Sequence, residues 1–310
     1  MGGADLPPPP PPRPGTPDAQ PEPGAARDRA PFIVVLVALV LLVAAVGGLV
    51  VVLQGGDEPP ADLSRRPVDG SAVYRVTAED QTAPTEEAPG GSLDIGATIT
   101  LDSGATATEV RIADVVARYQ GEPIPLFMRE AQTLRFDEQN VPDTVLLIGS
   151  DRAGTFYYFV DMLFPVVPTG STSEGASWPV SFEASLPAAT GSATYEGTGE
   201  LLGYDEIEGT NAAQVRNELT FEYDYEIIAS EAAMLAGGSA STGTIGVSGT
   251  GSMTVIGWID PATGVVLRSE IVGSYDVVFA YRDFPTEESG NGNFPSSGEF
   301  NVTLELQTSG

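Results

Sequence analysis

The sequence predicts a mainly β protein, in which one N-terminal transmembrane helix precedes an antiparallel curved sheet or half-barrel with few short helices. Three observations carry this prediction. A single long apolar run lies near the start of the 310-residue chain, and much of the chain beyond it alternates apolar and polar residues with a period of two. Gly, Pro and Asp mark turns between these alternating stretches.

Residues 1–31 form a Pro-rich segment that we expect to be a disordered cytoplasmic tail. The segment holds 11 of the 26 prolines, and six of them are consecutive at Pro7–Pro12. A proline run lacks backbone donors and favours polyproline II, so it cannot build a core. Two interpretations stay open: a low-complexity spacer, which the composition favours, and a docking ligand for a cytoplasmic partner with a Pro-binding module.

The apolar run Phe32–Leu53 is the predicted membrane-spanning helix. Its 22 residues include no charged side chain. A helix of that length reaches about 33 Å, enough for a hydrocarbon core of about 30 Å. The alternative is a cleaved signal peptide, whose apolar region is normally shorter. Because Arg27 and Arg29 precede the run, the positive-inside rule places the N-terminus in the cytoplasm and residues 54–310 outside. We therefore expect a single-pass protein of the cell membrane.

After Leu53 we predict a linker, residues 54–70, followed by an acidic β-rich extracytoplasmic domain, residues 71–310. Together they carry 39 Asp and Glu against 11 Arg. This excess of about 28 negative charges opposes binding to the phosphates of nucleic acid, so we predict no nucleic-acid partner. The same self-repulsion leads us to expect a monomer.

Period-two alternation predicts the strands of this domain. In Leu219–Ile228 the apolar residues Leu219, Phe221, Tyr223, Tyr225 and Ile227 alternate with polar ones. The same pattern occurs in Leu93–Leu101, Val180–Leu186, Met253–Ile259, Ile271–Tyr281 and Phe300–Gln307.

Two turns and two short segments complete the expected elements. Asp260–Gly264 has the Asp, Pro and Gly of a tight turn and predicts a hairpin over Met253–Tyr281. Glu206–Gly209 predicts a second turn. Thr108–Tyr119 suits either a helix or a strand, and Ser230–Ala236 suits one short helix.

The strand at Met253–Ile259 is apolar on both faces. Met253, Val255 and Ile259 lie on one face, and Ile256 and Trp258 lie on the other. A second apolar face is covered by another sheet, a helix or a ligand. Ile256 and Trp258 are therefore the candidate ligand-binding residues.

Two segments carry a resemblance to known envelope proteins. VIGWIDPATGVVLRSEIVGS, at Val255–Ser274, resembles the hairpin of LolA-like and LppX-like lipoprotein carriers and their relatives. FPVVPTGSTSEGASWPV, at Phe164–Val180, is similar to a segment of uncharacterised β-rich bacterial surface proteins with the same hairpin. The resemblance implies a curved antiparallel sheet with helices against its concave side. Those carriers are anchored through a lipidated Cys, which this chain lacks, so a transmembrane helix would replace the lipid.

The residue types that are missing restrict the chemistry. The chain has no His, Cys or Lys, which excludes His-based triads, thiolate nucleophiles, His- or Cys-ligated metals and Schiff-base lysines. We predict no cofactor and no metal site, and we assign Asp205, Glu206 and Glu208 to a solvated turn rather than to calcium. The favoured function is a non-enzymatic binding or structural role, and the first alternative is a membrane-tethered carrier or sensor of an apolar, lipid-like ligand.

The second alternative is an aspartic protease. Ile99–Thr106, which contains Asp102-Ser103-Gly104, resembles the catalytic loop of retropepsin-like proteases, and Ile148–Asp151 resembles their downstream Gly-containing element. The resemblance implies a homodimer, because the partner chain would have to supply the second aspartate. The short spacing between the two elements and the quality of Asp-Ser-Gly as an ordinary turn speak against this alternative.

Overall fold

The structure is a computed structural model that describes part of the chain beyond the predicted membrane helix. The described residues are 61–64, 70–84, 90–103, 108–124, 126–127, 131–134, 137, 139–142, 146–150, 156–159, 163–185, 189–231, 242–284 and 291–307. The predicted tail, residues 1–31, and the predicted helix Phe32–Leu53 lie outside these ranges. Among the described residues, no helix is long and apolar enough to span a bilayer.

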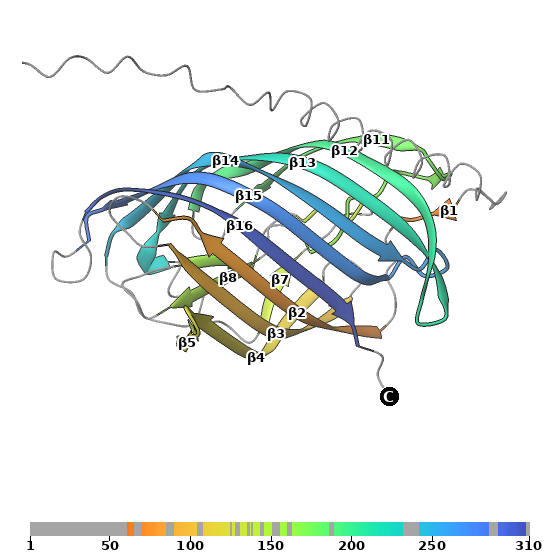
Figure 1. The fold of residues 1–310 in the computed structure, drawn as a ribbon, viewed down its shortest axis with the longest axis horizontal. Helices are drawn as coiled ribbons and strands as arrows, with labels where there is room; N and C mark the ends of the chain where they lie inside the picture. The colour runs from red at the N-terminus through yellow and green to blue at the C-terminus, as the bar shows by residue number, and fades with distance from the viewer. Residues whose placement is uncertain are drawn as a thin grey trace, which may run out of the picture. The chain divides into compact units, whose positions relative to one another are not determined.

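The prediction of a mainly β, antiparallel domain is confirmed (Figure 1). An eleven-stranded sheet has the order β11-β12-β13-β14-β15-β16-β2-β3-β4-β5, with β7 also paired to β4. Its path does not return on itself, so the sheet is open. Its strands are β2 (Gly70–Thr82), β3 (Gly91–Ser103), β4 (Thr108–Tyr119), β5 (Glu122–Pro123), β7 (Ala131–Leu134), β11 (Ser177–Ser185), β12 (Ala189–Ile207), β13 (Thr210–Ile228), β14 (Thr244–Ile259), β15 (Val266–Arg282) and β16 (Gly292–Leu306).

Two small sheets accompany the large one. β6 (Leu126–Phe127), β8 (Leu146–Ser150) and β9 (Phe156–Phe159) form a three-stranded sheet, and β1 (Ala61–Asp62) pairs with β10 (Ser171–Thr172). β1 and the fully buried Leu63 fall within the stretch expected to be a linker, so this part of it belongs to the folded domain.

The hairpin turns follow from their residues. Between β14 and β15, the amide of Ala262 and the hydroxyl of Thr263 donate to the Asp260 carboxylate at 2.9 and 2.7 Å, and Gly264 has a φ of 72°. Between β12 and β13, Glu208 and Gly209 have φ values of 49° and 84°, as a two-residue hairpin turn requires. Both predicted turns are confirmed.

The two ambiguous segments have different outcomes. Thr108–Tyr119 forms β4, so its strand alternative is the right one. Residues 229–231 are helical, and the rest of the predicted short helix lies outside the described residues.

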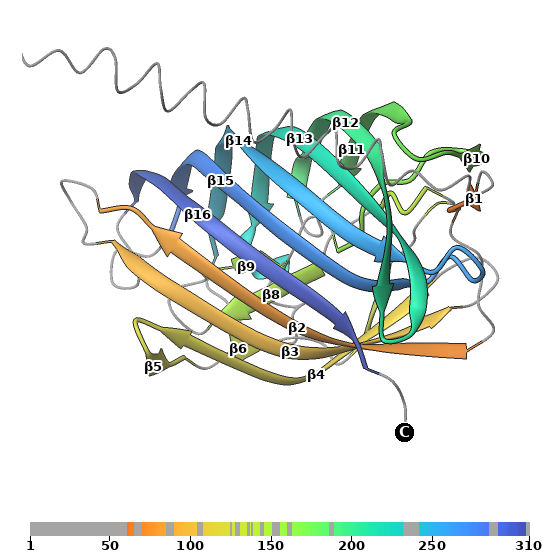
Figure 2. The ribbon, with the colours of Figure 1, turned by 45° about the vertical axis from the view of Figure 1, so that its right-hand side comes forward.

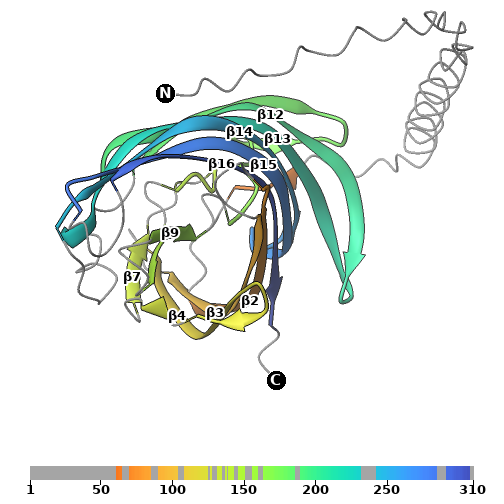
Figure 3. The same ribbon diagram turned by 60° about the vertical axis from the view of Figure 1, so that its left-hand side comes forward.

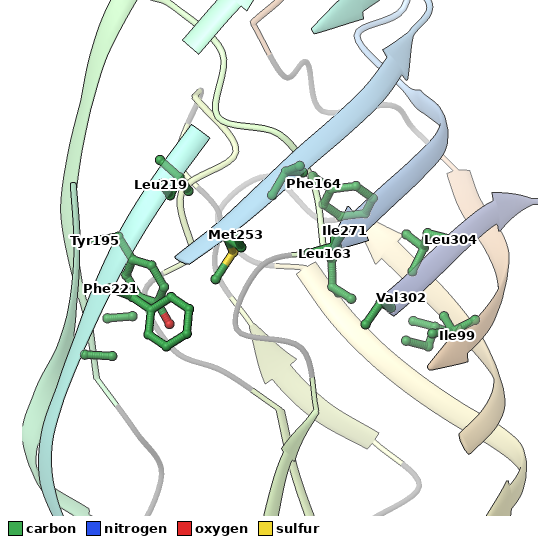
Figure 4. Close-up of a cluster of buried hydrophobic side chains, with 14 of the residues drawn as sticks. Ile99, Leu163, Phe164, Tyr195, Leu219, Phe221, Met253, Ile271, Val302 and Leu304 are labelled. Atoms are coloured by element: carbon green, nitrogen blue, oxygen red, sulfur yellow. The ribbon is translucent and has the colours of Figure 1, made fainter. Parts of the chain in front are cut away.

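The core lies on the inner, concave face of the large sheet (Figures 2 and 3). Alternate residues of β12–β16 and β2–β4 point to this face, and their apolar side chains form one buried cluster. The segment Leu163–Pro168 packs against this face. Leu163 and Phe164 are almost completely buried, and Figure 4 shows them among Met253, Ile271 and Val302 of the sheet.

One buried side chain ties this inner segment to the sheet. Asn217 on β13 is fully buried; its Oδ1 accepts from the Val166 amide at 2.6 Å and its Nδ2 donates to the Val166 carbonyl at 3.0 Å. These bonds satisfy backbone groups that cannot reach water. In the described ranges, extended segments rather than helices cover the concave face.

Candidate functional site

A groove of about 810 Å³ crosses the outer face of the sheet over β12, β13, β14, β15 and β16. These five strands lie side by side in Figures 1 and 2. Adjacent strands are about 4.8 Å apart, so a groove that crosses five of them is about 19 Å long. Its lining residues are Glu196, Gly197, Glu218, Leu219, Thr220, Ser252, Met253, Thr254, Val272, Gly273, Ser274 and Glu299.

Small side chains in register form the floor of the groove. Thr220, Ser252 and Ser274 are successive cross-strand partners on β13, β14 and β15, and all three are exposed. Gly197 and Gly273 lie one residue away along β12 and β15. Because Thr220, Ser252 and Ser274 all carry small side chains, the outer surface of the sheet is low here and hydroxyl groups line it.

Carboxylates stand at both ends of the floor. Glu196 is the cross-strand partner of Thr220, and Glu299 is the partner of Ser274, so one row runs from carboxylate to carboxylate through three hydroxyls. Glu218 also lines the groove and contacts Arg216 Nε at 3.5 Å. No Arg is among the lining residues. The groove therefore offers hydrogen-bond acceptors and negative charge.

One apolar side chain interrupts this polar surface. Val272 is 57% exposed and lies in the groove between Thr254 and the β16 strand. The groove thus combines acceptors with a small exposed apolar contact.

The predicted ligand residues Ile256 and Trp258 lie on the same outer face, on β14. Ile256 pairs with Arg216 and Glu270, and Trp258 pairs with Arg268. Neither residue lines the groove.

Charged side chains surround both of these residues. The guanidinium of Arg268 lies 5.4 Å from the Trp258 ring centroid and forms an ion pair with Glu270. Arg216 Nη2 lies 2.6 Å from Glu200 Oε2. Trp258 is only 8% exposed, which is consistent with a side chain covered by the stems of its charged neighbours.

The residues of the protease alternative lie on separate sheets. Asp102 and Ser103 are in the regular part of β3, where Asp102 pairs with Ser71 on one side and Glu109 on the other. Ile148 and Gly149 belong to β8 of the three-stranded sheet. Gly104–Thr106 and Asp151 lie outside the described residues.

Aromatic residues on the inner face form a continuous row across three strands. The rings of Phe182 and Tyr195 stack with centroids 4.6 Å apart and planes at 11°. Phe221 lies 6.1 Å from Tyr195 and 4.8 Å from Tyr223. Tyr195 and Phe221 are buried, whereas Phe182 and Tyr223 are half-buried. Tyr223, Tyr225, Tyr275, Phe279 and Tyr281, which alternate with other residues in the predicted strands, all lie within the core or pack against it.

A carboxylate on the inner face is the feature that sequence reasoning missed. Asp80 on β2 accepts a hydrogen bond from the Tyr275 hydroxyl of β15 at 2.9 Å. Burial raises the pKa of Asp80 above its ordinary value, and the Tyr275 hydrogen bond opposes this rise. Burial and the nearby Asp80 raise the pKa of Tyr275 to about 12. The sequence does contain one signal for this pair, since Asp80 is an acidic residue at an inward-facing position of an alternating strand.

No metal-binding cluster occurs in the described parts of the chain. There, no three acidic residues come together in an arrangement that could hold a metal ion. At the predicted solvated turn, the Asp205 carboxylate accepts from the Glu206 amide at 2.9 Å.

No protein-family model matches the chain, and no curated protein matches it.

Proposed function

We propose that this protein is a membrane-anchored, extracytoplasmic and non-enzymatic binding protein, and that the outer groove binds an extended, positively charged ligand. The observation that carries the proposal is the row Glu196–Thr220–Ser252–Ser274–Glu299, which crosses five strands with an acceptor on each. Hydroxyls and carboxylates in such a row pair with ammonium or guanidinium groups.

Catalysis that depends on His, Lys or Cys is excluded in the groove. Its polar side chains are hydroxyls and carboxylates, and the chain has no His, Lys or Cys to activate or replace a hydroxyl nucleophile. The carboxylates at its rim and its extended shape would select a ligand by its charge and its shape.

Binding of tetralysine to the full-length protein tests this proposal, with tetraserine as the uncharged comparison. Isothermal titration should show binding of tetralysine that weakens as salt is raised, and little binding of tetraserine. Ser252→Phe fills the centre of the floor and should weaken binding at least tenfold. Ser248→Phe places the same ring on the exposed outer face of β14 outside the groove and should leave the affinity unchanged. Equal binding by the two variants, or no binding by the wild-type protein, would contradict the proposal.

A carrier of an apolar, lipid-like ligand is the second candidate. The half-buried rings of Phe182 and Tyr223 in the inner aromatic row favour it, as does the resemblance of the Val255–Ser274 hairpin to lipoprotein carriers. Organic extracts of the purified full-length protein should then contain lipid in a fixed ratio to protein. Tyr223→Glu should lose this lipid, while Thr194→Glu on the exposed face of β12 should keep it. Extracts without stoichiometric lipid would remove this candidate.

A further inference from the structure

The eleven-stranded sheet consists of two meanders that meet at one seam. β2–β5 form the N-terminal meander, and β11–β16 form the C-terminal one. Within the described residues of this sheet, the only pairing between the two meanders is that of β16 with β2. This seam runs from the pair Gly298 and Thr82 to the pair Leu306 and Tyr74.

Two tyrosines brace the seam, one toward each end. Tyr74 on β2 donates from its hydroxyl to the Val266 carbonyl of β15 at 3.0 Å. Tyr275 on β15 donates to Asp80 Oδ1 of β2 at 2.9 Å. In both cases the hydrogen bond links β2 to β15, although β16 lies between these strands. The braces therefore fasten β2 to the C-terminal meander independently of the seam's own backbone hydrogen bonds.

A glycine makes the second brace possible. Gly298 on β16 is the cross-strand partner of both Tyr275 and Thr82. A Cβ atom at Gly298 would lie 2.6 Å from the Tyr275 hydroxyl oxygen, so the phenol ring lies over the bare backbone of β16. From there the Tyr275 hydroxyl reaches Asp80 and also lies 3.4 Å from Thr82 Oγ1.

The two braces differ in chemistry. The acceptor of Tyr74 is a backbone carbonyl, which does not titrate. The acceptor of Tyr275 is a carboxylate whose cross-strand neighbours are Phe300 and Leu93. Ionisation of Asp80 therefore places a charge at an otherwise apolar position of the inner face.

The groups that face Asp80 offer it no positive charge. In the described residues of β15, β16, β2, β3 and β4, the other titratable side chains on the inner face are all tyrosines: Tyr74 of β2, Tyr119 of β4, and Tyr275 and Tyr281 of β15. Glu79, Asp94 and Glu299 alternate to the opposite face. Tyr275 keeps its proton throughout the physiological range because its pKa is raised to about 12. Asp80 is thus the group whose charge changes.

We propose that the Tyr275–Asp80 pair is a pH-dependent latch on the β16–β2 seam, which holds the Asp80 end more tightly in acid than at neutral pH. The Tyr74 brace keeps the other end closed at both pH values. Opening at the Asp80 end separates the two meanders locally and exposes the inner face.

The direction of the effect follows from the burial of Asp80. Burial raises the pKa of Asp80 in the folded protein, so folding favours the protonated carboxyl. This stabilisation is fully present below the ordinary Asp pKa of 3.8. It is lost as the pH rises through the raised pKa of Asp80 in the folded protein. Above that range the seam keeps a half-buried carboxylate with one charge-assisted hydrogen bond from Tyr275.

Hydrogen–deuterium exchange of the full-length protein between pH 3.5 and 8 tests the latch. After correction for intrinsic exchange rates, peptides that cover residues 76–84 and 294–300 should lose protection at least fivefold as the pH rises. Peptides from the β13–β14 pairing report any global change, such as the relief of acidic self-repulsion. In Asp80→Asn, which keeps the shape without the charge, protection of the seam should change less than twofold over the same range.

Two further variants make the outcome decisive. Glu79→Gln removes a carboxylate from the exposed face of the same strand and should behave as the wild-type protein does. Tyr275→Phe removes the hydrogen bond that lowers the pKa of Asp80, so the midpoint of the transition should move to higher pH. The latch is refuted if wild-type protection at the seam does not depend on pH, or if Asp80→Asn keeps the wild-type dependence. If Asp80→Asn does not fold, an unchanged midpoint in Tyr275→Phe refutes it.

Discussion

The ring of Phe221 on β13 lies over the backbone of its cross-strand partner on β14, Gly251. Any Cβ atom at Gly251 would overlap the ring. The same relationship recurs at three other cross-strand pairs on the inner face. These are Trp178 with Gly199, Phe300 with Gly273, and Tyr275 with Gly298. Pairing a large ring with a glycine covers backbone that has no side chain of its own and makes room for the ring on the concave side of the sheet.

We expect Gly251→Ala to destabilise the domain by about 2 kcal/mol, because the added methyl group would overlap both the Phe221 ring and the backbone carbonyl oxygen of Ser274. Urea unfolding followed by tryptophan fluorescence measures this change. Gly246→Ala on the same strand is the matched control, since its Cβ atom would lie 3.4 Å from the Ala280 Cβ, an ordinary contact. If both variants are equally stable, the ring does not depend on the glycine.

Asn217→Ala should cost about 3 kcal/mol of unfolding free energy. The substitution removes both hydrogen bonds to Val166. The buried backbone amide and carbonyl of Val166 then lose these partners. Thermal melts compare this variant with Asn301→Ala, which removes an exposed amide from β16 and should change stability by less than about 0.5 kcal/mol. A small effect at Asn217 would mean that other contacts hold the inner segment.

The phenol of Tyr275 should titrate near pH 12, later than ordinary tyrosines. Because its pKa is raised in the folded state, the stability that it contributes is present below pH 10 and is lost as the pH rises toward 12. Burial also raises the pKa of Tyr281, so spectrophotometric titration at 295 nm should show more than one late phenol, and Tyr275→Phe should lose the one near pH 12. Titration of all ten tyrosines near pH 10 would contradict the burial of this group.

The proposed membrane topology predicts opposite results for two reporters at the C-terminus. An alkaline phosphatase fusion should be active, because this enzyme matures outside the cytoplasm, and a fluorescent protein that folds only in the cytoplasm should stay dark. Replacing Leu39 and Leu42 by Arg interrupts the apolar run Phe32–Leu53 and should abolish phosphatase activity. Cytoplasmic fluorescence of the unmodified chain would overturn the predicted orientation.

The sequence predicts the strands that carry their own alternation, such as Leu219–Ile228, and the turn whose Asp260 carboxylate bonds its neighbours. It does not predict the full length of β14. The first ten residues of this strand are TIGVSGTGSM, in which glycines and small polar residues replace a regular apolar alternation. One of these glycines, Gly251, lies under the Phe221 ring of the neighbouring strand, and this relation depends on register.

For a related reason, neither the groove nor the seam could be predicted from the sequence. Thr220, Ser252 and Ser274 have no distinctive chemistry one by one, and they become a floor only when three strands align them. Similarly, nothing near Asp80 in the sequence indicates Tyr275, because the strands that bring them together are far apart in the chain. Trp258 has a distinctive chemistry, but Arg268 covers its ring.

The position of the seam also affects how the protein reaches its native state. Of the described strands in the large sheet, β2 is synthesised first and its partner β16 last, so one edge of the N-terminal meander stays unpaired until β16 has been made. Such late, long-distance pairing makes folding slow and leaves an edge open to wrong partners. We therefore expect the protein to depend on chaperones while β2 waits for its partner β16 to be synthesised.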